Sequence, residues 1–201
     1  MDFSILLTLI ALGAFVLKSR DQGRRIALLG SYLGRHNLEK LMEALTQGYL
    51  RALGEADPAR QVQIWHLLET TELELSAQFN RFVTEFASVD KTQTQVSKLA
   101  IGIPYADKLF PAATFDLRKA FSIHAKGIAD AANNSLQLAP KDKAFIMLAE
   151  LFLMQHSCHW FCRSKTRASA RLLARHKTLY AQVLASVSAG TRQAYVALVA
   201  K

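Results

Sequence analysis

One stretch constrains the fold more than any other: residues 144–162, which read AFIMLAELFLMQHSCHWFC. Its first eleven residues are apolar apart from Glu150, and the remainder adds two histidines and two cysteines among aromatic side chains. Wound as a helix, this stretch has no polar face, so lipid or other parts of the chain must surround it. Three settings satisfy that demand: a membrane span, the centre of a helical bundle, or the frame of a cofactor.

The centre of a bundle is the favoured setting for this stretch. As a membrane span it would place Glu150, His156 and His159 in the hydrocarbon region, where ionisable side chains are costly and rare. Basic residues also flank both of its ends, so no charge asymmetry would orient it across a bilayer. We therefore predict that it forms the central helix of a cytoplasmic bundle.

A second apolar run, Phe3–Leu17, opens the chain and contains fifteen uncharged residues. A span needs about 20 residues. The aliphatic part of the Lys18 side chain can lie in the hydrocarbon while its ammonium reaches the water, which adds to the effective length of this run. Asp2 precedes the run, the positive charges follow it, and no small-residue cleavage motif closes it, which disfavours a signal peptide. The pattern predicts a single transmembrane signal-anchor with the N-terminus outside. A buried N-terminal helix is the alternative.

The chain as a whole predicts an all-α protein, because Val and Ile are sparse beside Leu and Ala. We expect residues 1–25 to form the membrane anchor with its basic flank. Residues 26–201 then form an antiparallel bundle of four to five helices. Within it, residues 91–113 contain two prolines and read as a crossover loop on the bundle surface. The length of this loop makes it a candidate docking segment, with a simple packed crossover as the alternative.

Polar residues interrupt the predicted core of the bundle. Glu72 and His124 each stand in an otherwise apolar helical stripe, and Glu150 stands in the central helix. Burying a carboxylate alone is expensive. The sequence therefore predicts that Glu72 or Glu150 contacts a His, Arg or Tyr from another helix.

Charge is distributed unevenly along the chain. The net charge is +9, and residues 151–201 contain eight Lys or Arg and no acidic side chain. Arginines recur there at every fourth position, which places them in a row on one side of a helix. The candidate interaction surface consists of Arg163, Lys165, Arg167, Arg171, Arg175 and Lys177.

This arginine row has four candidate partners. The acidic segment 55–90 could pair with it inside the fold, or anionic lipid headgroups could bind it at the membrane. An acidic partner protein is the third candidate. Nucleic acid is the fourth, and is disfavoured because, apart from Trp160 and Tyr180, no aromatic residues alternate with the basic ones and no recognisable binding motif is present.

Six side chains are weak ligand candidates by residue type: His124, His156 and His159 for a haem, and Cys158, Cys162 and Glu150 for a metal ion. The histidines and cysteines of residues 156–162 spread around one helix, so a single tetrahedral ion cannot be held by all four. No C-x-x-C-H motif for covalent haem attachment is present. We therefore expect no cofactor, no metal, and reduced thiols.

No catalytic motif for phosphate binding, zinc proteolysis or serine hydrolysis is present. We therefore expect no enzyme activity and no catalytic residues. The first hypothesis is a single-pass accessory or scaffold protein that binds a membrane complex or a cytoplasmic partner. The alternative is a haem- or metal-binding redox or sensor bundle that uses residues 156–162. A tethered binder of anionic lipid or nucleic acid is third.

The sequence also predicts the location and the partners of the protein. We expect the inner (plasma) membrane of a bacterium, with the body in the cytoplasm, and a eukaryotic endomembrane is the alternative. The membrane itself is contacted through Phe3–Leu17. We also expect a protein partner, and another integral membrane protein is one candidate.

Overall fold

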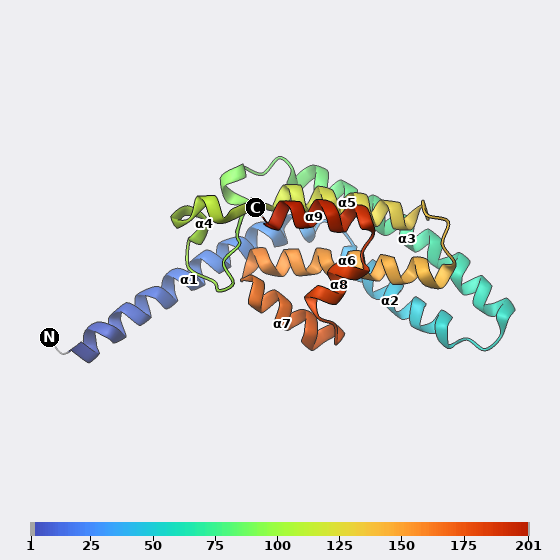
Figure 1. Ribbon diagram of the computed structural model, residues 1–201, viewed down its shortest axis with the longest axis horizontal. Helices are drawn as coiled ribbons and strands as arrows, with labels where there is room; N and C mark the ends of the chain where they lie inside the picture. Colours follow the sequence, from blue (N-terminus) through green and yellow to red (C-terminus); the bar gives the residue numbers. More distant parts are fainter. Residues whose placement is uncertain (1–2, 201) are drawn as a thin grey trace.

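The structure, a computed structural model, describes residues 3–200 and is all-α, as the sequence predicts (Figure 1). Two three-residue strands, β1 (Gln95–Ser97) and β2 (Thr114–Asp116), pair antiparallel, with Val96 opposite Phe115. The helices are α1 (Phe3–Leu33), α2 (Leu38–Gly54), α3 (Pro58–Phe86), α4 (Ala106–Leu109), α5 (Leu117–Ala132), α6 (Pro140–Cys162), α7 (Lys165–His176), α8 (Tyr180–Ser186) and α9 (Ala189–Ala200).

The central helix of the body is α6, the stretch without a polar face. It packs against α1, α2, α5, α7 and α8 and also meets β1. Ala149, Leu151 and Phe161, which point to different sides of this helix, are all buried. Because other helices surround it, α6 needs no lipid. The sequence prediction of a bundle centre is confirmed.

Aromatic side chains fill the interface between α3 and α5. Phe79, Phe82 and Phe86 recur along α3 at helical spacing and meet Phe121 of α5, and all four are fully buried. The rings of Phe82 and Phe121 meet edge to face with centroids 5.1 Å apart, a favourable geometry for aromatic pairs. This cluster holds the long helix α3 in the bundle.

Helix α1 is continuous from Phe3 to Leu33, and its two halves differ in burial. Every residue from Phe3 to Leu17 is exposed, and this half projects away from the body (Figure 1). It is long and apolar enough to cross a membrane. The second half packs on α3 and α6 and buries Asp21, Arg25 and Leu29. The boundary placed after residue 25 thus lies inside one helix, and the basic flank belongs to the body.

Residues 91–113 lie between α3 and α5 and contain more secondary structure than a plain loop. The segment holds the helix α4, the strand β1, and the 3₁₀ turns η1 (Lys91–Gln93) and η2 (Pro111–Ala113). β1 pairs with β2, which follows the segment and leads into α5. Strands of three residues leave no recognisable alternation in a sequence, which explains why this pairing was not predicted.

The two core carboxylates have different environments. Tyr49 of α2 donates its hydroxyl to Oε1 of Glu72 at 2.5 Å, and Nζ of Lys143 lies 2.5 Å from Oε2. The contact with Tyr49 confirms the predicted pairing. Glu150 instead accepts the backbone N–H of Ser188 at 3.0 Å, just before α9 begins. Burial raises the pKa of Glu150 above its ordinary value.

Candidate docking groove

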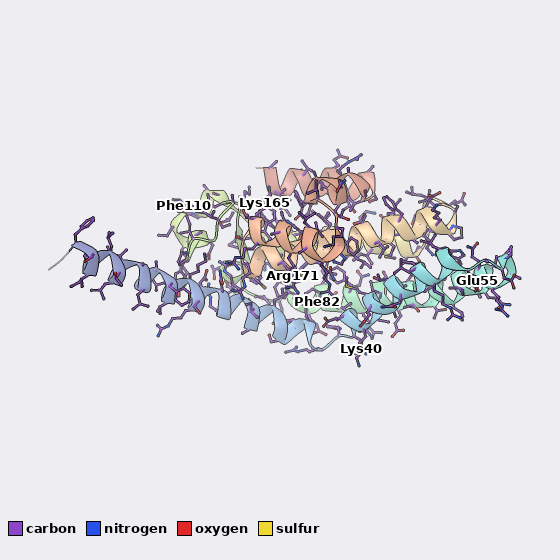
Figure 2. All side chains as sticks on the ribbon, turned by 90° about the horizontal axis from the view of Figure 1, so that it is seen from below. Lys40, Glu55, Phe82, Phe110, Lys165 and Arg171 are labelled. Atoms are coloured by element: carbon purple, nitrogen blue, oxygen red, sulfur yellow. The ribbon has the colours of Figure 1, made fainter. Side chains whose placement is uncertain are left out.

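A groove runs along the body, with α7 on one side, α1 and α2 on the other, and α6 at its base. Its part beside α1 has a volume of about 610 Å³, and its part beside α2 has a volume of about 860 Å³. Figure 2 views the molecule from the side of these helices and labels Arg171 on one wall and Lys40 on the other. The two parts are continuous, since both are lined by Gly30, Leu33, Cys158, His159 and Arg171.

The start of α7 determines which way the arginine row faces. Ser164 accepts the backbone N–H of Arg167 at its Oγ, 3.3 Å away, and so caps the helix. Ala168 and Leu172 are buried against the body. The remaining side of α7 carries exposed arginines that line the groove, namely Arg163 just before the helix and Arg167, Arg171 and Arg175 within it.

The arginines of the groove lack carboxylate partners within the described part of the chain. No Asp or Glu oxygen of residues 3–200 lies within 4.0 Å of Arg163, Arg167, Arg171 or Arg175. Arg163 donates instead to Oε1 of Gln22 on α1. Four guanidinium groups are therefore available to an external anion.

The acidic segment 55–90 does not meet this row. Helix α7 packs on α6 and α8, whereas α3 packs on α1, α2 and α5. Among the acidic residues of α3, Glu85 lies 3.7 Å from Arg35 and 3.5 Å from His36. Internal pairing between the acidic and basic helices, one of the four alternatives, is therefore wrong.

The two lysines predicted with the arginine row lie apart from the groove. Nζ of Lys165 sits over the rings of Trp160 and Tyr180, at 5.1 and 5.4 Å from their centroids. Such cation–π contacts keep the ammonium against the body. Lys177 is exposed and has a positive φ of 53°, and it ends α7. Of the six predicted surface residues, the four arginines share the groove.

The wall opposite the arginines is apolar beside α1. It is formed by Ile26, Leu29 and Leu33, with Gly30 between them, and no acidic residue lines this part of the groove. The part beside α2 is mixed, because Glu39 and Glu43 line it as well. The half of the groove nearer the apolar run of α1 thus combines a hydrocarbon wall with a guanidinium wall.

His159 and the two cysteines lie at the base of the groove. Burial, with added repulsion from Arg171 and Arg175, lowers the pKa of His159 to about 4. Burial also raises the pKa of the Cys158 thiol well above its usual range and that of Cys162 to about 11. Both thiols are free and stay protonated at neutral pH, so neither is an activated nucleophile.

The other ligand candidates are held in separate places. Nε2 of His124 lies 2.8 Å from Oγ of Ser157, and Nε2 of His156 lies 3.0 Å from Oγ of Ser169. Glu150 faces the start of α9. Within residues 3–200, no three His, Cys, Asp or Glu side chains are grouped so that they could hold a metal ion. The structure does not bring the six candidates together, and the expected lack of a cofactor stays a prediction.

We predict that the protein loses stability between pH 6.5 and 4 because of its buried histidines. Their pKa values are lowered by burial to about 3 for His124 and about 4 for His156 and His159. In the unfolded chain a histidine has a pKa of about 6.5, so below that pH the unfolded state binds more protons and is favoured. Urea unfolding in mild detergent at several pH values measures this loss. His159→Gln should make the loss smaller while His124 and His156 still contribute to it, and an unchanged profile would contradict a lowered pKa at His159.

The comparisons with known proteins add no relative: the chain matches no family model, no curated protein and no solved structure.

Proposed function

We propose that this protein is a non-catalytic, single-pass membrane accessory protein that docks an acidic amphipathic helix of a partner protein in the groove between α1 and α7. One observation carries the proposal. Three arginines without carboxylate partners among residues 3–200, Arg163, Arg167 and Arg171, line the part of the groove whose opposite wall is apolar, and Arg175 continues the row into the mixed part. A helix with carboxylates on one face and leucine-type residues on the other matches both walls.

The dimensions of the row suit a helical partner. From Arg167 to Arg175 helix α7 rises by about 12 Å, or a little over two turns. A partner with carboxylates at every fourth position would place each of them near one guanidinium group. Arginine favours such partners because its planar fork binds carboxylates with two hydrogen bonds. A helix continuing from the partner's own membrane span would run beside α1 and enter this groove.

The anchor and its orientation belong to the same proposal. The exposed apolar half of α1 supports membrane insertion through Phe3–Leu17. The positive charges that follow Leu17 support a cytoplasmic body with the N-terminus outside. We propose the inner membrane of a bacterium as the location. Anionic lipid or nucleic acid in the groove is an alternative that the following test separates, and visible absorbance and metal analysis of the purified protein test a haem or metal in the body.

Photo-crosslinking from the groove tests the proposed partner. A benzophenone side chain at Leu33, on the apolar wall, should crosslink in intact cells to one protein segment in which acidic residues recur at helical spacing. The same group at Leu67, which is 71% exposed on α3, is the matched control. Adducts with lipid or nucleic acid alone would replace the proposed partner with one of those ligands.

A set of arginine variants measures the charge contribution. We expect Arg167→Gln/Arg171→Gln/Arg175→Gln to lower the affinity for the identified segment about 100-fold, at about 1 kcal/mol for each exposed ion pair. The matched Lys variants keep the charge and should retain most of the binding. Equal affinity of the Gln variant and the unaltered protein would contradict an electrostatic role for the row.

A further inference from the structure

The crossover between α3 and α5 exposes large apolar side chains that the body leaves uncovered. Ile101 is 66% exposed, Leu109 is 63% exposed and Phe110 is 46% exposed. They belong to the segment 98–110, which we call the proximal loop. Its one acidic residue, Asp107, is buried, while of its two basic residues Lys98 is half-buried and Lys108 is exposed. Gathered apolar side chains of this kind usually mark an interaction surface.

The proximal loop lies at the end of the body from which the apolar half of α1 emerges. Figure 1 shows α4 beside α1 at that end, and Figure 2 labels Phe110 there. Lys18 is the first charged residue after the apolar run. Its Cε lies 3.6 Å from the point that a Cβ at Gly102 would occupy. Ile101 and Gly102 therefore lie level with the point where α1 would leave the hydrocarbon.

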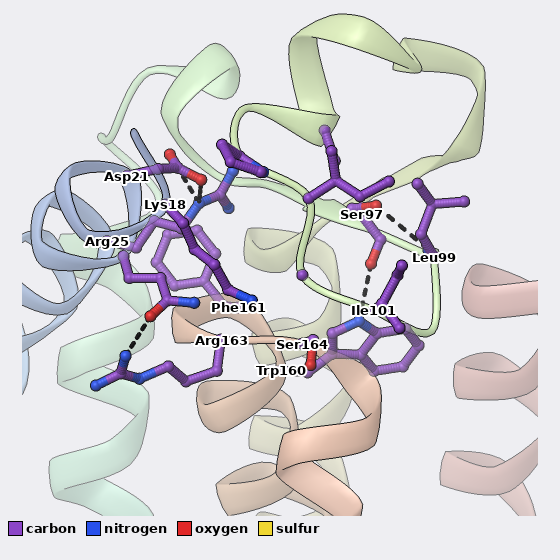
Figure 3. A pocket seen from close by; sticks show the side chains of 15 residues that line it. Lys18, Asp21, Arg25, Ser97, Leu99, Ile101, Trp160, Phe161, Arg163 and Ser164 are labelled. Atoms are coloured by element: carbon purple, nitrogen blue, oxygen red, sulfur yellow. Dashed lines mark hydrogen bonds and ion pairs between the residues drawn. The ribbon is translucent and has the colours of Figure 1, made fainter. Parts of the chain in front are cut away.

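A buried ion-pair network fixes the proximal loop to α1. Nη2 of Arg25 lies 2.6 Å from Oδ1 of Asp107, and Nε of Arg25 lies 3.3 Å from Oδ2 of Asp21. The backbone N–H of Tyr105 also donates to Asp21 at 3.3 Å. Figure 3 shows Asp21 and Arg25 on α1 facing the loop around a small cavity of about 30 Å³. These contacts fix the position of the proximal loop along the axis of α1.

Several cationic groups lie at or next to the proximal loop. Nζ of Lys108 lies 5.5 Å from the ring centroid of Tyr105, and Cζ of Arg24 lies 5.8 Å from the same centroid. Lys18 and Arg20 follow the apolar run on α1. Exposed apolar side chains together with nearby basic ones are the composition of surfaces that sit in the headgroup layer of anionic membranes.

We propose that the proximal loop is a second membrane contact, with Ile101, Leu109 and Phe110 inserted into the headgroup layer of the bilayer that α1 enters. This inference rests on the membrane anchoring in the proposed function. Two points of attachment, the span and the loop, would stop the body from rotating about the axis of α1. The docking groove would then face one fixed direction beside the membrane.

Fluorescence of a probe at position 110 tests the contact in the full chain. The variant Phe110→Cys, in a background of Cys158→Ala and Cys162→Ala, carries an environment-sensitive label and is reconstituted into phosphatidylcholine vesicles with phosphatidylglycerol. We expect blue-shifted emission and several-fold stronger quenching by nitroxide-bearing lipids than for the control label at Leu67→Cys on α3. Replacing Lys98 and Lys108 by Gln should weaken the quenching when phosphatidylglycerol is present.

The possible failures are distinguishable. If the labelled protein floats with the vesicles but the label at position 110 has the emission of a probe in water, the loop contact is overturned and membrane anchoring through α1 is supported. If the protein does not float with the vesicles, both the anchor and the loop contact are overturned. A label at Ile101→Cys should show the same blue shift and quenching as the label at position 110. Adding Leu109→Glu/Phe110→Glu should return the emission of the label at position 101 to that of a probe in water, while the protein still floats with the vesicles.

Discussion

Replacing Lys143 by Met should lower the free energy of unfolding by about 3–5 kcal/mol, the usual cost of leaving one partner of a buried ion pair alone. Nζ of Lys143 is the cation beside the carboxylate of Glu72, and both side chains are almost fully buried. Without it, Glu72 keeps the hydroxyl of Tyr49 as its remaining polar contact. Chemical unfolding of the full chain in mild detergent measures the loss.

A double variant separates the ion pair from the packing around it. Lys143→Met/Glu72→Gln removes the unpaired charge while the amide oxygen still accepts the hydrogen bond from Tyr49. We expect it to recover most of the lost stability, because replacing both partners of a buried pair is often nearly neutral. A double variant as unstable as Lys143→Met alone would show that the loss comes from packing.

The second large effect is expected at Arg25. Arg25→Met leaves two buried carboxylates, Asp21 and Asp107, without their shared cation. It also removes the hydrogen bond to the backbone carbonyl of Gln95, 2.8 Å away. We expect a loss of about 3–5 kcal/mol, together with faster amide hydrogen exchange in the proximal loop. Hydrogen exchange followed by mass spectrometry measures both changes by segment.

Arg24 provides a matched control for this prediction. It also pairs with Asp21, at 3.1 Å, but its side chain is 44% exposed. Arg24→Met should cost no more than about 1 kcal/mol, because water screens an exposed pair. Similar losses for the two variants would indicate that burial of the Arg25 network contributes little to stability.

The helical core could be predicted from the sequence because its signals are local. The apolar spacing of Phe79, Phe82 and Phe86 identifies one face of α3, and the lack of a polar face identifies α6 as surrounded. Asp57 and Pro58 mark the start of α3, where Oδ1 of Asp57 accepts the N–H of Ala59 at 2.9 Å. These patterns depend on neighbours within one or two turns.

The groove could be predicted only in part. The spacing of Arg163, Arg167, Arg171 and Arg175 indicated a shared face, and that face does line the groove. The opposite wall was missed, because whether Ile26 and Leu33 of α1 face an arginine depends on how two helices distant in sequence pack together. The buried pairing of Arg25 with Asp107 was missed for the same reason, since 82 residues separate the two side chains.

The continuity of α1 has a mechanical consequence. Helix α1 is unbroken over about 46 Å and contains both the exposed apolar half and the wall formed by Ile26, Leu29 and Leu33. A continuous helix of this length is stiff, so a change in the tilt of its outer half also moves its inner half. If the outer half spans a bilayer as proposed, a change in bilayer thickness, which changes the tilt of a span, would reach the wall formed by Ile26, Leu29 and Leu33 through the same helix.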